Sequence, residues 1–235
     1  MNSIPATARL AGVFYLLMSI LAIIGYFYLP STYYVAGDAA ATARKISENL
    51  PLYRFGIFNA LVTDILFLFV VLTLHRLFRD VDRHQALIMV ILVCVPVAAQ
   101  IANLAYRMAP LTLLGGADYL KALPQTELEV LAFAQLRVAS TGGQLLTVFW
   151  GLWLFPFGIL TIKSGYFPRF LGILLFISGA AYVVSFTVAT LLPEQSAAVS
   201  RIMMPLYFGE LGMVLWLPIM GARAPQAEVQ LSRAG

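Results

Sequence analysis

Six apolar stretches constrain this chain more than any other feature, because each is long enough to cross a lipid bilayer. A helix rises about 1.5 Å per residue, so about 20 mostly apolar residues cross the hydrocarbon core. The predicted spans run approximately over residues 10–29, 55–74, 86–109, 140–162, 170–192 and 202–221. We therefore expect an all-α fold, an integral membrane bundle of six transmembrane helices that forms a single transmembrane domain over residues 1–235.

The composition agrees with this class and excludes others. Of the 235 residues, 61% are hydrophobic and 11% are charged, whereas about a quarter of the residues in a soluble domain are charged. The net charge of +4 comes from bases in the short segments between apolar stretches, so no basic face for nucleic acid is predicted. The expected partner is the lipid bilayer, and the sequence identifies no protein partner.

Lysine and arginine in short connections predict the orientation of the helices, since such connections usually remain in the cytoplasm. The second connection carries Arg76, Arg79 and Arg83, and the fourth carries Lys163 and Arg169. The longer first and third connections carry their bases more sparsely. We therefore expect a multi-pass protein of the cell (inner) membrane with both termini in the cytoplasm.

Each of the two long outer connections is expected to contain a short surface helix. Asp38 is a predicted N-cap for the alanine-rich segment after it, and Thr126 with Glu129 forms a capping-box pattern. A helix that continued unbroken from there to residue 162 would be much longer than a bilayer requires. A bend is therefore predicted near Gly142 and Gly143, where the backbone is least restrained.

Prolines and small residues within the spans predict kinks and close packing. Pro96, Pro156 and Pro205 each remove a helix hydrogen bond and favour a kink. Two pairs of glycines are spaced seven residues apart and favour close helix approach: Gly151 with Gly158, and Gly172 with Gly179. Tyrosine and tryptophan residues are interpreted as interface anchors or packing residues.

The fourth span and the connection after it resemble a known family. The chain reads FWGLWLFPFG at residues 149–158 and KSGYFPRFLG at residues 163–172, and Arg54, Phe55 and Gly56 open the second span. These segments are similar to a bacterial family of uncharacterised membrane proteins, known only as a domain of unknown function. The resemblance implies a six-helix inner-membrane protein, and it brings no activity and no catalytic residue.

Two acidic residues within the spans are the first candidates for function. A charge near the middle of a span costs about 2–3 kcal/mol on insertion scales, so it normally faces the bundle interior. Asp64 lies nine residues from the outer start of the second span, and Glu210 lies eight residues from that of the sixth. Both are therefore predicted at a depth of about 12–14 Å, where the two side chains can meet.

Other polar residues are predicted in the same half of the membrane. Gln100, Asn103 and Arg107 share one face of the third span, and Arg137 and Gln144 recur on the fourth helix. The candidates for ligand binding or a proton relay are Asp64, Gln100, Asn103, Arg107, Arg137, Gln144 and Glu210. One interpretation is a pocket open to the outside, with acids at its floor and arginines at its mouth. The alternative is a set of structural hydrogen bonds and ion pairs.

An enzyme is the less favoured interpretation. His84 lies close to Asp80 and Asp82, but the arginines interleaved with them neutralise a potential metal site. No zinc motif or phosphate-binding loop is present in the sequence, so we expect no catalytic residue, no metal and no cofactor. The best hypothesis is binding or transport of a small polar solute or lipid through the outer-half pocket. The alternative is a non-catalytic membrane scaffold or regulatory partner protein.

Overall fold

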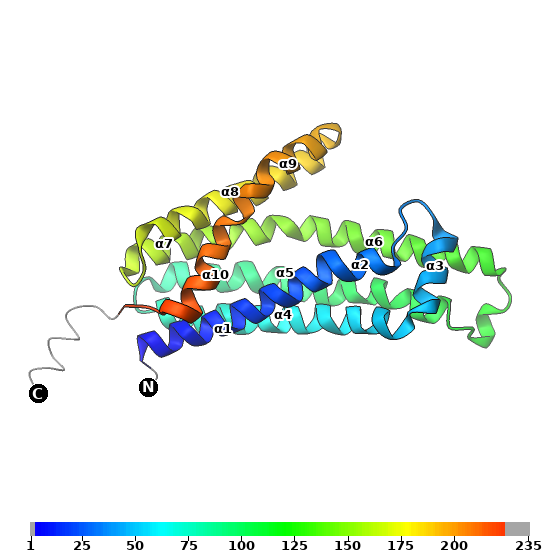
Figure 1. The fold of residues 1–235 in the computed structure, drawn as a ribbon, viewed down its shortest axis with the longest axis horizontal. Helices are drawn as coiled ribbons and strands as arrows, with labels where there is room; N and C mark the ends of the chain where they lie inside the picture. The colour runs from blue at the N-terminus through cyan, green and yellow to red at the C-terminus, as the bar shows by residue number, and fades with distance from the viewer. Residues whose placement is uncertain (1–2, 224–235) are drawn as a thin grey trace, which may run out of the picture. The chain divides into compact units, whose positions relative to one another are not determined.

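The computed structural model describes residues 3–223, so both ends of the predicted 1–235 domain lie outside the described residues. Within that range the chain is all-α, and six helices are long and apolar enough to cross a membrane (Figure 1). They comprise Ile4–Tyr33, Leu50–Phe78, Arg83–Leu113, Gln125–Ser164, Arg169–Leu191 and Pro193–Met220. Each predicted span overlaps one of these helices, which confirms the predicted fold class.

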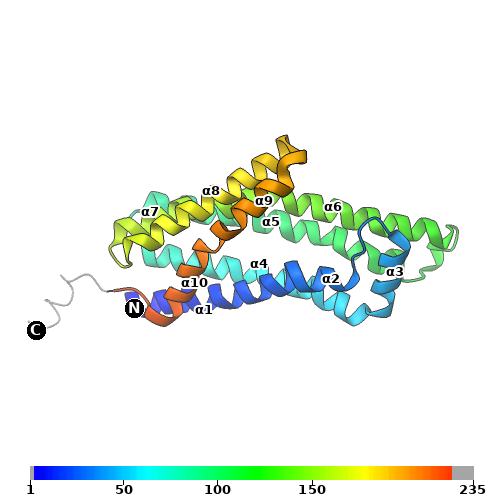
Figure 2. The same cartoon turned by 45° about the horizontal axis from the view of Figure 1, so that its top comes forward.

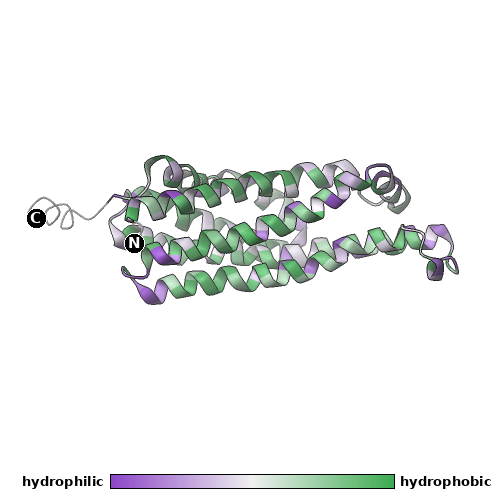
Figure 3. Cartoon of the chain, turned by 90° about the horizontal axis from the view of Figure 1, so that it is seen from below, coloured by the Kyte–Doolittle hydropathy of each residue, from purple (hydrophilic) through white to green (hydrophobic). Residues whose placement is uncertain are grey.

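Several of these helices are composite. The first combines α1 (Ile4–Ile23), a π-helical turn η1 (Ile24–Tyr28) and α2 (Leu29–Tyr33). The other elements are α3 (Ala39–Glu48), α4 (Leu50–Phe78), α5 (Arg83–Leu113), η2 (Asp118–Leu120), α6 (Gln125–Leu152), α7 (Leu154–Ser164), α8 (Arg169–Leu191), η3 (Pro193–Gln195), α9 (Ser196–Tyr207) and α10 (Gly209–Met220). Figure 3 shows that apolar residues predominate along the helices and that many hydrophilic residues lie near helix ends and in connections.

The chain forms two compact units, which divide several of the long helices between them. Unit 1 comprises Met1–Leu17, Leu66–Pro96 and Leu146–Gly235. Unit 2 comprises Met18–Ile65 and Val97–Leu145. Unit 1 contains α7, α8, α9 and α10, and unit 2 contains α3 and η1. The two units are described separately below.

Aromatic residues form the core of unit 1. Trp153 is 1% exposed, and its ring lies 5.1 Å from that of Phe67 and 5.3 Å from that of Phe157, measured between centroids. Phe78 is fully buried and lies 6.1 Å from Phe157. Phe67 and Phe78 belong to α4, Phe157 to α7, and Trp153 lies between α6 and α7. Together the rings bury a large apolar area, which fixes this part of the fourth span against α4.

The paired glycines lie at a close helix contact within unit 1. A Cβ on Gly151 would lie 2.7 Å from the carbonyl oxygen of Gly179, and a Cβ on Gly158 would lie 3.0 Å from that of Gly172. Figures 1 and 2 show α7 beside α8 along this contact. The predicted close approach is therefore confirmed, and it occurs within the chain.

The fourth span is interrupted at a different residue from the one predicted. Helix α6 continues through Gly142 and Gly143 to Leu152, and the interruption falls at Trp153. The ring of a proline clashes with the carbonyl four residues earlier, so Pro156 explains the end of α6 at Leu152. Glycine permits a bend but does not impose one. The predicted bend at the glycine pair was therefore wrong, whereas the predicted effect of Pro156 is confirmed.

The other two span prolines differ in effect. Helix α5 is unbroken at Pro96, whereas the sixth span is interrupted at Phe208, three residues after Pro205. The Ser178 hydroxyl donates to the carbonyl of Leu206 at 2.8 Å, so a backbone acceptor beside the interruption is satisfied from α8. A Cβ on Gly209 would lie 2.6 Å from that hydroxyl, so only glycine fits between α8 and α10 here.

In unit 2, the first long connection contains the predicted surface helix. Asp38 caps α3 as predicted, since its carboxylate accepts a hydrogen bond from the Ala41 amide at 2.8 Å. Ile46 of α3 is 1% exposed and packs in one cluster with Tyr53 and Leu136. This cluster holds α3 against α4 and α6 by burying its apolar face.

The helix predicted in the third connection begins two residues earlier than its capping pattern implied, and it is the first part of α6 and not a separate short helix. Helix α6 starts at Gln125, and the amides of Glu127 and Leu128 donate to the carbonyl of Pro124. Thr126 therefore lies inside the first turn, and the predicted capping box was wrong. Pro124 ends the preceding loop and supplies the first helical acceptor in its place.

Candidate functional site

A network of polar side chains links three elements of unit 2. Asn103 Nδ2 of α5 donates to the Ala139 carbonyl of α6 at 2.8 Å and lies 3.3 Å from Gln100 Oε1. Gln100 Nε2 donates to the Tyr26 hydroxyl of η1 at 3.2 Å. A Cβ on Gly142 would lie 2.7 Å from Asn103 Oδ1, so glycine allows α6 to approach this network. Gln100 and Asn103 thus interact from one helix face, as their spacing predicts.

The π-helical turn η1 is a feature that the sequence analysis missed. Pro30 lacks the amide that would bond to the carbonyl of Tyr26 in an α-helix, and this favours a wider turn before the proline. Asn59 Nδ2 donates to the carbonyl of Leu21 at 3.0 Å, and a Cβ on Gly25 would lie 2.6 Å from that nitrogen. Pro30 is therefore the residue in the sequence that could have pointed to this irregular turn.

Asp64 is a buried acid in the interior of α4, with 9% of its surface exposed. Among the described residues no side chain forms a hydrogen bond or ion pair with its carboxylate, and Arg107 of α5 acts on it only through the electrostatic field. Asn59, also buried on α4, has no hydrogen bond to its Oδ1 among the described residues. Buried polar atoms of this kind are rare and call for a physical explanation.

A small cavity lies beside Arg107 in unit 2. Its lining includes Gly25, Tyr33, Tyr53 and Gly56, and its volume is about 10 Å³. That volume is close to the minimum for one water molecule. The Tyr53 hydroxyl donates to the backbone carbonyl of Arg107 at 2.5 Å and so ties α4 to α5 at the cavity. The sequence analysis assigned no site role to these tyrosines, because aromatic residues are common as membrane anchors.

Arg137 and Gln144 of α6 have exposed side chains. Arg137 lies 3.5 Å from the Tyr34 hydroxyl, and the Tyr34 ring stacks on Phe133 with centroids 5.5 Å apart. The structure therefore places these two candidates on the surface of unit 2, outside the buried amide network.

Glu210 lies in the first turn of α10, in unit 1. The buried Tyr15 hydroxyl donates a hydrogen bond to Glu210 Oε1, and the Tyr15 ring packs edge-on against Trp153 at 5.8 Å. The positive end of a helix dipole also favours an acid at this position. Because Glu210 and Asp64 belong to different units, their predicted approach stays a prediction.

The acids near His84 have basic partners. Lys163 Nζ lies 2.7 Å from Asp82 Oδ2, and Asp80 lies 3.8 Å from Arg79. The hydrogen bond from Lys163 and a second from the Gln85 amide lower the pKa of the Asp82 carboxyl. Both acids thus take part in ion pairs, Asp80 with a neighbouring arginine and Asp82 with a lysine distant in the sequence. The Lys163 pair also joins the second and fourth connections at one end of unit 1.

Together, the all-α architecture and the six apolar spans define a multi-pass membrane protein. The chain belongs to the family described as "Domain of unknown function (DUF4386)", which it matches over residues 10–221. It is 40% identical over 76 residues to an uncharacterized protein of Archaeoglobus fulgidus, a match that covers 32% of this chain and 44% of that protein. The match therefore spans less than half the length of this relative. No solved structure matches the chain.

Proposed function

We propose that this protein binds, and in doing so transports, a small polar solute or lipid at the Asp64 cluster. This cluster comprises Asp64, Gln100, Asn103, Arg107 and Tyr26, all within unit 2. The burial of Asp64 without a hydrogen-bond or ion-pair partner among the described residues carries the proposal. An acid within a span costs about 2–3 kcal/mol on insertion scales, and no direct contact of the described residues offsets that cost. A ligand or a transported proton is the explanation we favour.

The charges of the cluster support a polar ligand. Asp64 supplies a negative charge and Arg107 a positive one, and the amides of Gln100 and Asn103 lie on the same face as Arg107. The cavity beside Arg107 has a volume of about 10 Å³, so in this proposal the binding of a solute larger than water requires the helices to move apart. Arg137 and Gln144 belong to the rim in this proposal, and Glu210 is a second proton-relay candidate in unit 1.

We also propose that the protein lies in the inner membrane of the cell and that both of its termini face the cytoplasm. The Lys163–Asp82 ion pair supports it, because it joins the two connections that are rich in bases. Single cysteines at Gly165 and Gly116, introduced in a Cys94→Ser background, test this orientation in intact cells. We expect a membrane-impermeant thiol reagent to label only position 116, and labelling of position 165 alone contradicts the orientation.

A ligand screen tests the proposed site. The unfolding temperature of the full-length protein in detergent is measured with a panel of small cations, anions, zwitterions and short-chain phospholipids. A ligand that binds the folded state raises this temperature by mass action. For the best ligand we expect the affinity to fall about tenfold in Asp64→Asn and to stay unchanged in Glu127→Gln, an exposed acid in the first turn of α6. Equal affinity in Asp64→Asn and the parent rejects this site.

The amide network favours the second candidate function, a scaffold or regulatory partner. Gln100 and Asn103 already satisfy each other and the carbonyl of Ala139, as expected of groups that only hold helices together. In that case the panel contains no ligand whose binding requires Asp64. Cross-linking then captures a protein partner equally well with the parent and with Asp64→Asn.

A further inference from the structure

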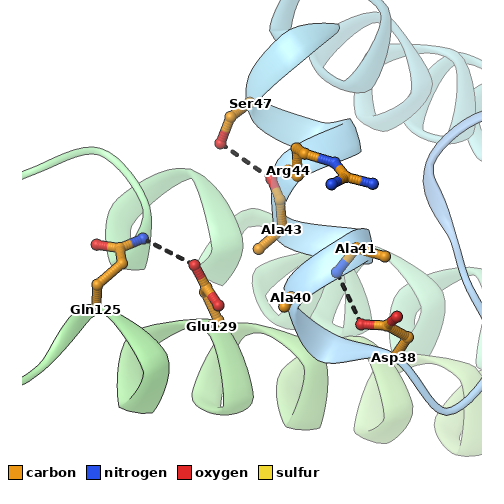
Figure 4. Close-up of a pocket in the computed structure, with 8 residues that line it drawn as sticks. All are labelled: Asp38, Ala40, Ala41, Ala43, Arg44, Ser47, Gln125 and Glu129. Carbon is orange, nitrogen blue, oxygen red and sulfur yellow. Dashed lines mark hydrogen bonds between the residues drawn. The ribbon is translucent and has the colours of Figure 1, made fainter.

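A polar groove lies between α3 and the first turns of α6, within unit 2 (Figure 4). Its volume is about 530 Å³, which falls within the range of small-molecule sites. The residues that carry the argument are Asp38, Ala40, Arg44, Ser47, Gln125 and Glu129. We call this feature the α3–α6 groove. It is separate from the Asp64 cluster, and the sequence analysis assigned it no function.

The two helices present polar faces to the groove for a simple geometric reason. Ala40, Arg44 and Ser47 recur at helical spacing on α3, and Gln125 and Glu129 are one turn apart on α6. The apolar face of α3 is buried against the cluster around Ile46. This packing fixes the position of α3 relative to α6, and Ala40, Arg44 and Ser47 line the groove beside the packed face, where the small side chain of Ala40 leaves room between the helices.

Side chains of opposite charge, Arg44 of α3 and Glu129 of α6, both line the groove, and each has a polar partner on its own helix. Arg44 has its acidic partner on its own helix, Glu48, at 4.0 Å, and both side chains are mostly exposed. Such a pair contributes little to stability. Glu129 accepts a hydrogen bond at 3.4 Å from Gln125, also on its own helix. Among the described residues no ion pair joins Arg44 to Glu129, so both charges remain available to a ligand that lies between them.

The groove lies well outside the hydrocarbon core if the predicted fourth span begins near Ser140. Gln125 is then about 22 Å beyond the start of that span along α6. This distance exceeds the depth of a headgroup layer, which is about 5–8 Å on each side. The geometry therefore favours a ligand that arrives from water over a headgroup anchored in the bilayer.

We propose that the α3–α6 groove binds a small zwitterion, whose anionic group contacts Arg44 and whose cationic group contacts Glu129. Asp38 is a weaker partner for the cation, because one of its carboxylate oxygens already caps α3. The same chemistry occurs in a free amino-phosphate or amino-carboxylate and in the headgroup of a zwitterionic phospholipid. The argument above selects the free solute.

The test uses three probes that separate the two charges. Free phosphoethanolamine carries both groups, ethanolamine only the cation, and ethyl phosphate only the anion. Their affinities for the full-length protein in detergent are measured by calorimetry, together with that of dihexanoyl phosphatidylethanolamine. We expect phosphoethanolamine to bind about tenfold more tightly than either single-charge probe, because it contacts both charges of the groove at once.

Matched variants assign the binding to the groove. We expect Arg44→Gln and Glu129→Gln each to weaken phosphoethanolamine binding about tenfold, and Ala40→Leu to weaken it by filling the groove without changing charge. Lys45→Gln and Glu127→Gln change the same charges at positions outside the lining, and they should leave the affinity unchanged. Asp64→Asn should also leave it unchanged, so that failure here is distinguishable from failure of the proposed transmembrane site.

Three results overturn the proposal. The first is that neither phosphoethanolamine nor dihexanoyl phosphatidylethanolamine shows saturable binding. The second is that ethanolamine or ethyl phosphate binds as tightly as phosphoethanolamine. The third is that Arg44→Gln and Glu129→Gln have the same affinity for phosphoethanolamine as their control variants. If only dihexanoyl phosphatidylethanolamine binds, and it requires both charges, the ligand source is lipid and the choice of a free solute is wrong.

Discussion

Glu210 in unit 1 and Asp64 in unit 2 are both acids within apolar spans, yet their surroundings differ. Glu210 accepts a hydrogen bond from a buried tyrosine, Tyr15, and lies at the start of α10. Asp64 is buried in the interior of α4 with no hydrogen bond or ion pair among the described residues. An acid with a donor can stabilise the fold, whereas an acid without one is an energetic cost that function must explain.

The two units that contain these acids also differ in how closely their helices are packed. Unit 1 is closely packed, with aromatic rings around Trp153 and a glycine contact between Gly151 and Gly179. Unit 2 contains amides that bond across helices, an irregular turn and a small cavity beside Arg107. Close packing resists movement, so we expect unit 1 to be the rigid part and unit 2 the part that rearranges around a ligand.

The largest expected effect comes from adding one methyl group to a glycine of α6. In unit 1, a Cβ on Gly151 would lie 2.7 Å from the Gly179 carbonyl and from Tyr182 Cβ, so Gly151→Ala should destabilise the protein by about 1–3 kcal/mol through overpacking. In unit 2, a Cβ on Gly143 would meet only Gln100 Oε1 at 3.9 Å. Gly143→Ala should therefore be neutral, or stabilising by about 0.5–1 kcal/mol. Thermal unfolding in detergent measures both changes, and equal unfolding temperatures contradict the contrast in packing.

Removing one hydroxyl group from each unit tests the hydrogen bonds. Tyr15→Phe leaves Glu210 without its donor and should cost about 1.5–3 kcal/mol. Tyr26→Phe removes a neutral acceptor of Gln100 on a side chain that is 38% exposed, and should cost about 0.5–1.5 kcal/mol. Unfolding temperatures of the two variants decide the order. A greater loss in Tyr26→Phe contradicts the assignment of Glu210 as the better satisfied acid.

A smaller effect is expected outside the spans, where Asp82 pairs with Lys163. The lowered pKa of Asp82 means that the folded state favours its carboxylate. Its contribution to stability is therefore present above the ordinary value of about 4 and is lost as the pH falls through the lowered pKa. Below that ordinary value the unfolding temperature of the parent should fall more steeply with pH than that of Lys163→Gln. Parallel pH profiles contradict a stabilising role for this pair.

Much of the fold is predictable from the sequence because apolar length is a local property. The six spans, the Asp38 cap and the contact of the paired glycines follow from spacing alone. The position at which the fourth span is interrupted was harder to predict, because both Gly142 and Pro156 are candidates. The helix ends before Pro156, because the proline ring clashes with the preceding turn, whereas glycine only permits a bend. The π-helical turn before Pro30 depends on the same chemistry, but its length is set by packing.

The candidate site is only partly predictable. Gln100 and Asn103 interact because they lie three residues apart on one helix, which periodicity reveals. The Tyr15–Glu210 hydrogen bond joins residues 195 positions apart, and no local pattern specifies such a pair. The α3–α6 groove was missed for the same reason, since it depends on how Ile46 orients one short helix against another.

The stability of Asp64→Asn, alone and combined with Arg107→Gln, tests the central claim most directly. The claim is that Asp64 is maintained at a cost to the fold. It predicts that Asp64→Asn leaves the unfolding temperature in detergent unchanged or raises it by a few degrees, about 2–4 °C for each kcal/mol gained, and that Arg107→Gln adds no rescue. A clear loss in Asp64→Asn that is recovered when Arg107 is also neutralised would instead identify a structural ion pair and contradict the proposed site.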